Sequence, residues 1–335
     1  MVGRSAEVRA SRSEVILGGT PTEKTLKKFL QGIPGVDTVG AEARAADFQT
    51  RSIKTSSKAW GLDKILSMID LTTLEGADTR GKVRTLSRKA VSPDPMDLSC
   101  RSVAAVCVYG DMVEEAISAL GEHHVSKRPD GVAVASVATA FPSGRADLRV
   151  KIMDTQLAVA AGADEVDMVI DRGAFLAGNL GSVFDQIVQV KEACLRADGS
   201  FAHLKVILET GELVTLDNVR RASWLAILAG ADFIKTSTGK VAPAATLPVT
   251  VTMLEVIREW FGITGERIGM KPAGGIRSSK DALRYLVAVA ETVGEDWLSN
   301  ELFRFGASSL LNDVVMQRQK LKTGHYSGPD YVSVD

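Results

Sequence analysis

The strongest constraint on the fold is an alternation between short apolar runs and longer segments of helical length. Eight runs rich in Val and Ile each precede such a segment. The runs are KILSMIDLT (64–72), VAAVCVYG (103–110), VAVASVATAF (132–141), EVDMVID (165–171), HLKVILETG (203–211), DFIKTSTG (232–239), RIGMKPAGG (267–275) and LFRFGASS (302–309). Continuous apolar runs are typical of strands buried on both faces. Eight strand–helix units predict an α/β fold of the (β/α)8 or TIM barrel type, which takes roughly 250 residues.

The main alternative is a doubly wound open sheet. That fold gives no reason for eight units, and the dinucleotide fingerprint GxGxxG is absent after the first run. Two helices can be placed by their apolar stripes. One is expected over residues 147–161, with Leu148, Ile152, Leu157 and Val159 on its buried face, and the other over residues 216–228.

The two ends of the chain differ from this pattern. We expect residues 1–58 to form an N-terminal extension that is partly helical, residues 59–322 the barrel, and residues 323–335 a polar C-terminal tail. Within the extension a helix is expected over residues 21–31, with Thr20 as N-cap and Pro21 at its first position. The sequence leaves open whether the extension packs on the barrel or is loosely tethered.

Charge, hydropathy and cysteine content limit the classes of partner and the compartment that we expect. Lys and Arg number 40 against 41 Asp and Glu, a formal charge of −1, whereas nucleic-acid binders usually carry an excess of basic residues. No apolar run approaches the roughly 18 residues of a membrane span, and the N-terminus lacks the apolar core of a secretory signal. Three cysteines cannot build a disulfide framework. We therefore expect a cytoplasmic protein that binds neither nucleic acid nor membranes; homo-oligomerisation is left open.

Two lysines stand out where strands end. Lys235 follows Ala-Asp-Phe-Ile inside an apolar run, and Lys271 holds the matching place on the next run. In a barrel of this type the active site lies at the carboxyl ends of the strands, and neighbouring strands are roughly 5 Å apart. A buried lysine next to a second cation has a lowered pKa and can attack a carbonyl as a neutral amine. One such lysine alone is more often an ion pair; two at matching strand ends favour a functional pair.

Asp167 completes the set, because it lies inside the apolar run 166–169 and needs a lysine partner to stay charged there. Paired with Lys271, it could pass protons to and from a reacting amine. A structural salt bridge is the alternative.

Glycine-rich turns follow the last three runs. Loops at this place, together with a helix N-terminus, form the common phosphate site of the barrel fold. Three adjacent turns, with Lys240 and Arg277 nearby, predict a phosphorylated small-molecule substrate. The predicted phosphate-binding residues are Gly239, Gly274, Gly275, Gly306, Ser308 and Ser309.

Other chemistries are not supported. The four histidines show no metal-ligand spacing, so we expect neither a metal nor another cofactor. No GxSxG elbow is present. Cys107 is interpreted as a buried strand residue near the pocket.

Seven segments together resemble the deoxyribose-phosphate aldolase family from about Ala59 to Leu321. These are SMIDLTTLEGADT, VCVYG, GADEVDMVIDRGAFLAGN, KVILETGEL, GADFIKTSTGK, GMKPAGGIR and RFGASSLL. The resemblance implies a (β/α)8 barrel without metal, which reversibly cleaves 2-deoxy-D-ribose 5-phosphate to D-glyceraldehyde 3-phosphate and acetaldehyde through a Schiff base.

The resemblance also implies residue roles. Lys235 would be the Schiff-base lysine, Lys271 the lysine that tunes it, and Asp167 the proton relay. Asp70, in the DLTTL motif with Thr72, would contact the substrate hydroxyls together with Lys240. Some members end on a tyrosine that reaches into the site, and here Tyr326 or Tyr331 could take that place.

Alternatives stay open at this point. A different Schiff-base aldolase for sugar phosphates, or a transaldolase-like enzyme, would use the same lysine. A sugar-phosphate sensor built on a barrel is less favoured, because both lysines and the aspartate are present.

Overall fold

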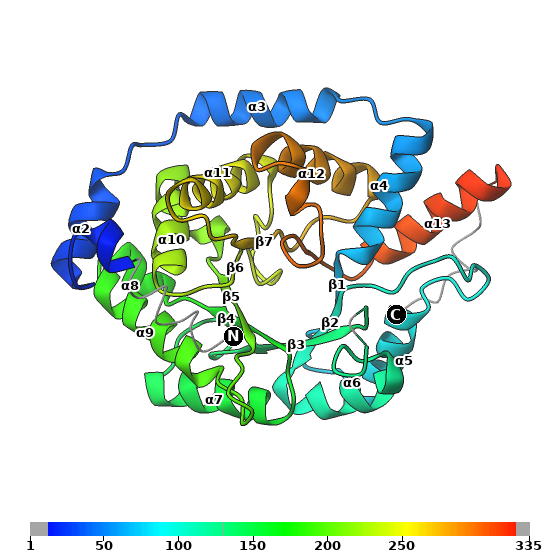
Figure 1. The fold of residues 1–335 in the computed structure, drawn as a ribbon, viewed down its shortest axis with the longest axis horizontal. Helices are drawn as coiled ribbons and strands as arrows, with labels where there is room; N and C mark the ends of the chain where they lie inside the picture. Colours follow the sequence, from blue (N-terminus) through cyan, green and yellow to red (C-terminus); the bar gives the residue numbers. More distant parts are fainter. Residues whose placement is uncertain (1–12, 129, 326–335) are drawn as a thin grey trace.

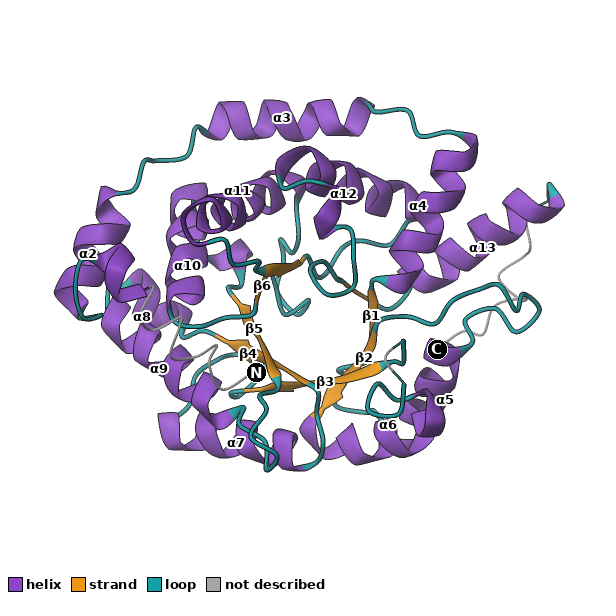
Figure 2. Cartoon of the chain, viewed as in Figure 1, coloured by secondary structure: helices purple, strands orange, loops and turns teal. Residues whose placement is uncertain are grey.

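The computed structural model describes residues 13–128 and 130–325. Eight parallel strands form its centre, in the order β7-β6-β5-β4-β3-β2-β1-β8 (Figure 2). Parallel bridges from Met270 to Phe303 and from Ala273 to Gly306 join the two ends of this order. The strands are β1 (Ile69–Thr72), β2 (Ala105–Tyr109), β3 (Ala133–Ala138), β4 (Glu165–Val169), β5 (His203–Ile207), β6 (Phe233–Lys235), β7 (Gly269–Lys271) and β8 (Phe305–Ala307). The prediction of a (β/α)8 barrel is confirmed.

Helices surround the ring of strands (Figure 1). Those that follow the strands are α5 (Arg80–Val91), α6 (Val113–Leu120), α7 (Leu148–Ala160), α8 (Arg172–Leu176), α9 (Leu180–Ala193), α10 (Leu216–Leu228), α11 (Leu247–Thr264), α12 (Ser279–Thr292) and α13 (Leu310–Thr323). Several begin at a side-chain cap: the side chains of Asp147, Thr215, Thr246 and Ser278 each accept a hydrogen bond from a backbone N–H in the first turn. Among the described residues, no helix is both long and apolar enough to span a membrane.

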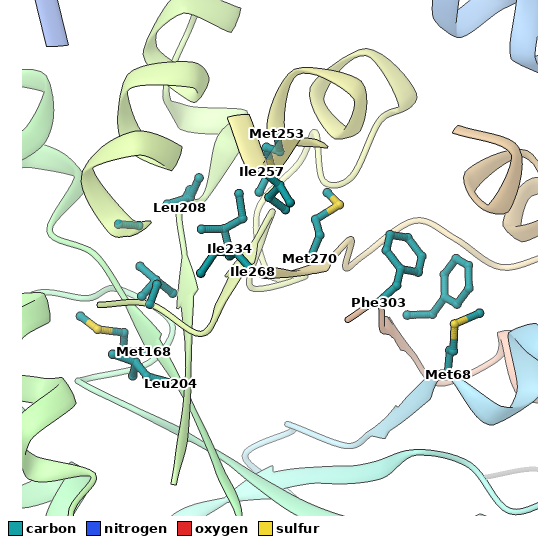
Figure 3. Packing of buried hydrophobic residues seen from close by; sticks show 14 of the residues in the cluster. Met68, Met168, Leu204, Leu208, Ile234, Met253, Ile257, Ile268, Met270 and Phe303 are labelled. Atoms are coloured by element: carbon teal, nitrogen blue, oxygen red, sulfur yellow. The ribbon is translucent and has the colours of Figure 1, made fainter. Parts of the chain in front are cut away.

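The alternation of side chains along β6 and β7 decides what reaches the barrel interior. Figure 3 shows Ile234 and Met270 beside Met253 and Ile257 of α11, in the layer between strands and helices. Successive side chains of a strand point to opposite faces. The neighbours of these two residues, Lys235 and Lys271, therefore point into the barrel.

The first predicted run was partly wrong. Residues 64–67 are the last turn of a helix, α4 (Thr55–Ser67), and β1 begins only at Ile69. Leu62, Ile65 and Leu66 are fully buried at helical spacing, and α4 packs against α12 and α13. A short apolar run cannot be told from a buried helix turn by periodicity alone.

The buried face predicted for α7 was only partly right: Val159 is buried and Leu148 and Ile152 are partly buried, and the bounds of the helix agree with the prediction. Leu157 is 62% exposed, whereas Lys151 and Thr155 are buried. The Lys151 ammonium donates to Gln186 Oε1 of α9 at 2.7 Å, and the Thr155 hydroxyl donates to the Lys151 carbonyl. Polar groups that find partners can thus replace an apolar stripe. In α10 the apolar residues expected on the buried face are all buried; they are Val219, Ala222, Trp224, Leu225 and Leu228.

The N-terminal extension packs on the outside of the barrel through α2 (Glu23–Gly32), α3 (Thr38–Thr50) and α4. In Figure 1, α3 lies along the outer side of α11 and α12. On α2, Leu26 and Leu30 are fully buried and the helix packs on α9 and α10. The N-cap of α2 is Thr22, not Thr20, because Thr22 and Thr25 form a reciprocal capping box.

The bounds of α4 and α13 cross both predicted domain boundaries. Helix α4 spans the boundary after residue 58, and α13 ends at Thr323. The tyrosines at 326 and 331, considered above for the active site, lie outside the described residues.

We predict that the extension contributes to the stability of the barrel. Leu30→Ala should lower the free energy of unfolding by about 2–5 kcal/mol, because it leaves a cavity between α2 and the barrel. The measurement is urea denaturation. Val39→Ala on α3, at a side chain that is 77% exposed, is the control and should change stability by less than about 0.5 kcal/mol. Equal stability of both variants would mean that α2 contributes little to the folded state.

Candidate active site

A cavity of about 440 Å³ opens at the carboxyl ends of the strands. It lies between the loops after β1, β6, β7 and β8, which are far apart in sequence but adjacent in the barrel. Lys235 lines it. The predicted substrate residues that also line it are Thr72, Gly239, Lys240, Gly274, Gly275, Gly306, Ser308 and Ser309. The structure therefore brings together in one cavity residues that the sequence places on four loops.

Lys235 and Lys271 are register partners on β6 and β7. Both side chains are buried, and both ammonium groups donate to the same oxygen, Oδ2 of Asp167, at 2.8 and 2.9 Å. Asp167 reaches them from β4 and is itself fully buried. The predicted lysine pair and its aspartate thus form one cluster.

Asp70 on β1 also belongs to this cluster. Its Oδ2 is 2.6 Å from the Lys271 ammonium, and its Oδ1 accepts from Arg304 Nη1 at 2.7 Å. The side chain has no exposed surface. Asp70 therefore acts directly on Lys271, and its predicted contact with substrate hydroxyls stays a prediction.

The sequence analysis missed three members of the cluster: Glu165, Lys205 and Arg304. Lys205 donates to Asp167 Oδ1 at 3.0 Å and also to Glu165 Oε2. Arg304 donates to Glu165 Oε1 at 2.9 Å. A signal existed, because each is a charged residue in an apolar run, and Glu165 and Asp167 are two residues apart and so share a strand face.

The balance of charge in the cluster sets the protonation of the lysines. Burial alone would lower the pKa of Lys271, but Asp167 and Asp70 raise it well above its ordinary value. For Lys235, burial lowers the pKa, Asp167 opposes the shift, and Lys271 lowers the pKa further; the net shift is downward. Despite burial, the ammonium groups of Lys205, Lys235 and Lys271 hold the pKa of Asp167 well below its usual value. Of the three lysines in contact with Asp167, Lys235 is the only one whose pKa is lowered.

Glu209 holds the loop that follows β6. Its carboxylate accepts from the Thr238 N–H at 3.2 Å and from the Thr238 hydroxyl at 2.6 Å, and Arg172 lies 3.4 Å away. Burial raises the pKa of Glu209. In the same loop, Lys240 forms an ion pair of 2.7 Å with Glu75 across the cavity. The loop can thus present a cation to a ligand from a fixed anchor.

The glycine turns approach one another closely. Gly274 has φ +80°, and a Cβ there would lie 2.6 Å from the Ala244 Cβ and 3.2 Å from the Gly239 Cα. At Gly306 a Cβ would meet Ala273 at 2.7 Å and the Lys271 Cε at 3.1 Å. Only glycine fits without displacing these neighbours. Helix α13 begins directly after Ser308 and Ser309, so its N-terminus adds a partial positive charge suited to an anion.

The remaining candidates have structural surroundings. Cys107 is buried with its sulfur 4.0 Å from Asp167 Oδ2, and burial raises the pKa of its thiol. His124 is bonded to Asp164 and Ser126. Within residues 13–128 and 130–325, no group of three or more His, Cys, Asp or Glu residues is arranged to hold a metal ion.

Comparison with known proteins finds that the chain is similar to aldolases. The model of the DeoC/LacD family of aldolases matches residues 64–315. The human deoxyribose-phosphate aldolase is 45% identical over 293 residues, covering 85% of this chain and 89% of the relative. The mouse enzyme of the same name is 44% identical over 293 residues, with the same coverage. Among solved structures, the tetrameric deoxyribose phosphate aldolase of Aeropyrum pernix is 27% identical with a TM-score of 0.55, covering 81% of this chain and all of that chain.

The family match covers the barrel from the end of α4 to α13, including every strand that supplies a residue of the buried cluster. With this match and the identity to the two mammalian relatives, the chain belongs to the DeoC/LacD family of aldolases.

Proposed function

We propose that this aldolase reversibly cleaves 2-deoxy-D-ribose 5-phosphate to D-glyceraldehyde 3-phosphate and acetaldehyde through a Schiff base on Lys235. The observation that carries the proposal is the buried pair Lys235–Lys271, whose two ammonium groups share one oxygen of Asp167 at the floor of the cavity. The names of the mammalian relatives support the substrate.

The first step needs a neutral amine. Lys235 has the lowered pKa that this requires, and it lines the cavity where an aldehyde carbon can approach. Its nitrogen attacks C1 of the open-chain sugar, and the aldehyde oxygen takes up a proton. Loss of water from the carbinolamine then leaves the protonated imine. Asp167 Oδ2 contacts the Lys235 nitrogen, and Lys271 contacts the same oxygen. Both groups are therefore placed to move these protons.

The carbon–carbon bond breaks next. A base removes the proton of the C3 hydroxyl, the C2–C3 electron pair flows into the imine, and C3 leaves as the aldehyde of glyceraldehyde 3-phosphate. The enamine that remains takes a proton at C2, and hydrolysis of the imine releases acetaldehyde and restores the Lys235 amine. The iminium nitrogen accepts the electrons, so this route requires no metal ion.

The phosphate would bind at the other side of the cavity. Gly239, Gly274, Gly275 and Gly306 with Ser308 and Ser309 supply backbone and hydroxyl donors, and Lys240 and Arg277 supply charge. The site thus has an anion cradle on the loops and a reactive amine on its floor.

We further propose that the enzyme works in the cytoplasm and that its partner is the small-molecule sugar phosphate, with neither nucleic acid nor a membrane involved. The free thiols of Cys100, Cys107 and Cys194 support a reducing compartment.

Lys235→Met should abolish covalent trapping of acetaldehyde by borohydride, because no other amine lining the cavity has the same surroundings. The measurement is the intact mass of the protein after reduction, with EDTA present throughout. Lys280→Met, at the start of α12, is the control and should trap fully. Full trapping by Lys235→Met would assign the Schiff base to another lysine.

Asp167→Asn and Lys271→Met should lower kcat by about 100- to 10,000-fold, because both remove a group that moves protons at the reacting nitrogen. Lys235 remains in both variants, so slow trapping of acetaldehyde should persist. Steady-state kinetics with 2-deoxyribose 5-phosphate give the measurement. Near-normal turnover in either variant would contradict its assignment as a proton relay.

Ser308→Asp should suppress turnover of 2-deoxyribose 5-phosphate by about tenfold or more, because a carboxylate in the cradle repels the phosphate and one hydroxyl donor is lost. Turnover of unphosphorylated 2-deoxyribose should change far less. Ser308→Asn keeps the size without the charge and is the matched control. An equal loss for both sugars would mean that Ser308 does not contact the phosphate.

A further inference from the structure

Lys205 is a buried cation with no role in the reaction steps above. It stands opposite Phe233 on β6, two residues before Lys235, and opposite Asp167 on β4. It is therefore one layer deeper in the barrel than the reactive amine. The side chain has no exposed surface. A lysine that is fully buried requires either a compensating partner or a function.

The carboxylate oxygens of the cluster are distributed unequally. Arg304 and Lys205 take both oxygens of Glu165, Arg304 takes Oδ1 of Asp70, and Lys205 takes Oδ1 of Asp167. The two other oxygens, Asp70 Oδ2 and Asp167 Oδ2, face the upper lysines, and Lys205 lies 3.9 Å from Asp70 Oδ2 as well. Lys271 contacts both of these oxygens, whereas Lys235 contacts only Asp167 Oδ2, which it shares with Lys271.

The formal charges show that the cluster has one cation in excess. With every group ionised, the cluster holds four cations, Lys205, Lys235, Lys271 and Arg304, against the three carboxylates of Asp70, Glu165 and Asp167, which is 4 − 3 = +1. Release of one proton brings the buried cluster to neutrality. Lys235 has the fewest carboxylate contacts of the three lysines, so it loses that proton at the lowest cost.

Other groups face Lys235 as well. The Cys107 thiol projects from β2 and stays protonated because burial raises its pKa. At the cavity, Lys240 and Glu75 form an ion pair with each other. Lys82 and Arg277 line the cavity as further cations. None of these groups contacts Asp167 Oδ1 in place of Lys205.

We propose that Lys205 is a positioning residue that keeps Lys235 in its neutral, nucleophilic form by holding the far oxygen of Asp167 and supplying the excess buried cation. This inference rests on Lys235 being the Schiff-base lysine. The proposal also predicts an opposite effect for Glu165, the carboxylate that contacts Lys205. Removal of the Glu165 charge should lower the pKa of Lys235 and favour its neutral amine further.

The size of the effect follows from charge interactions over a few ångströms. Lys205 and Lys235 contact the two oxygens of the same carboxylate, at 3.0 and 2.8 Å, and Glu165 contacts Lys205. A charged group within about 4–6 Å shifts a pKa by about 1–3 units, and we expect the more distant Glu165 to have the smaller effect of the two. Lys205→Met leaves three cations and three carboxylates, so Lys235 should hold its proton to higher pH. Glu165→Gln leaves four cations and two carboxylates, so Lys235 should lose its proton at lower pH. The double variant again has one cation in excess.

The test is the pH dependence of kcat/KM in the wild type, Lys205→Met, Glu165→Gln and the double variant. Unphosphorylated 2-deoxyribose is the substrate, because a phosphate that titrates near pH 6 would otherwise contribute to the profile. The acid limb should move up by about one unit or more in Lys205→Met and down in Glu165→Gln. In the double variant it should return toward the wild type.

Thermal unfolding of each variant separates this role from a structural one. A merely structural ion pair predicts that both single variants lose stability and activity without opposite displacements of the acid limb, and that result would overturn the proposal. If Lys205→Met does not fold, the downward shift in Glu165→Gln and the profile of the double variant still decide the question. Borohydride trapping at Lys235 in the wild type is the separate check of the Schiff base: its absence would refute the proposed function, whereas trapping without any shift would refute only the role of Lys205.

Discussion

One carboxylate oxygen organises the candidate active site. Oδ2 of Asp167 accepts from two lysine ammonium groups at nearly equal distances, within a cluster of buried side chains. In such surroundings an unpaired charge is very costly, so every proton is placed by its neighbours. Lys271 has a second carboxylate and Lys235 does not. In the proposed mechanism, this difference of one ion-pair contact distinguishes the proton carrier from the nucleophile.

The barrel makes this arrangement possible because the register between neighbouring strands places inward-facing side chains next to one another. Lys235 and Lys271 pair directly across β6 and β7, Asp167 pairs with Lys205 across β4 and β5, and Asp70 pairs with Gly306 across β1 and β8. Each strand contributes one or two inward side chains at a defined height. The absence of a side chain at Gly306 leaves room for Lys271. Charges on strands are held more rigidly than charges on loops, as a shared oxygen requires.

Much of this could be predicted from the sequence, since local patterns determine it. The eight apolar runs predicted the barrel, and a lysine at each of two successive strand ends predicted the pair. The ion pairs of Lys205, Glu165 and Arg304 could not be predicted in the same way, because they depend on how strands whose residues lie 40 to 139 positions apart in sequence are aligned. The buried face of α7 was only partly predicted for a similar reason, because the burial of Lys151 depends on Gln186 of another helix.

The phosphate proposed for the loops creates an electrostatic conflict with the amine. A dianion in the cavity would favour the protonated form of Lys235, since an opposite charge nearby stabilises an ammonium. Lys240, Arg277 and the N-terminus of α13 lie on the phosphate side and offset that charge locally. The cations of the buried cluster act on the opposite side of the amine. Under the proposed mechanism, a neutral nucleophile can thus coexist with a charged substrate, because the two electric fields come from different layers of the barrel.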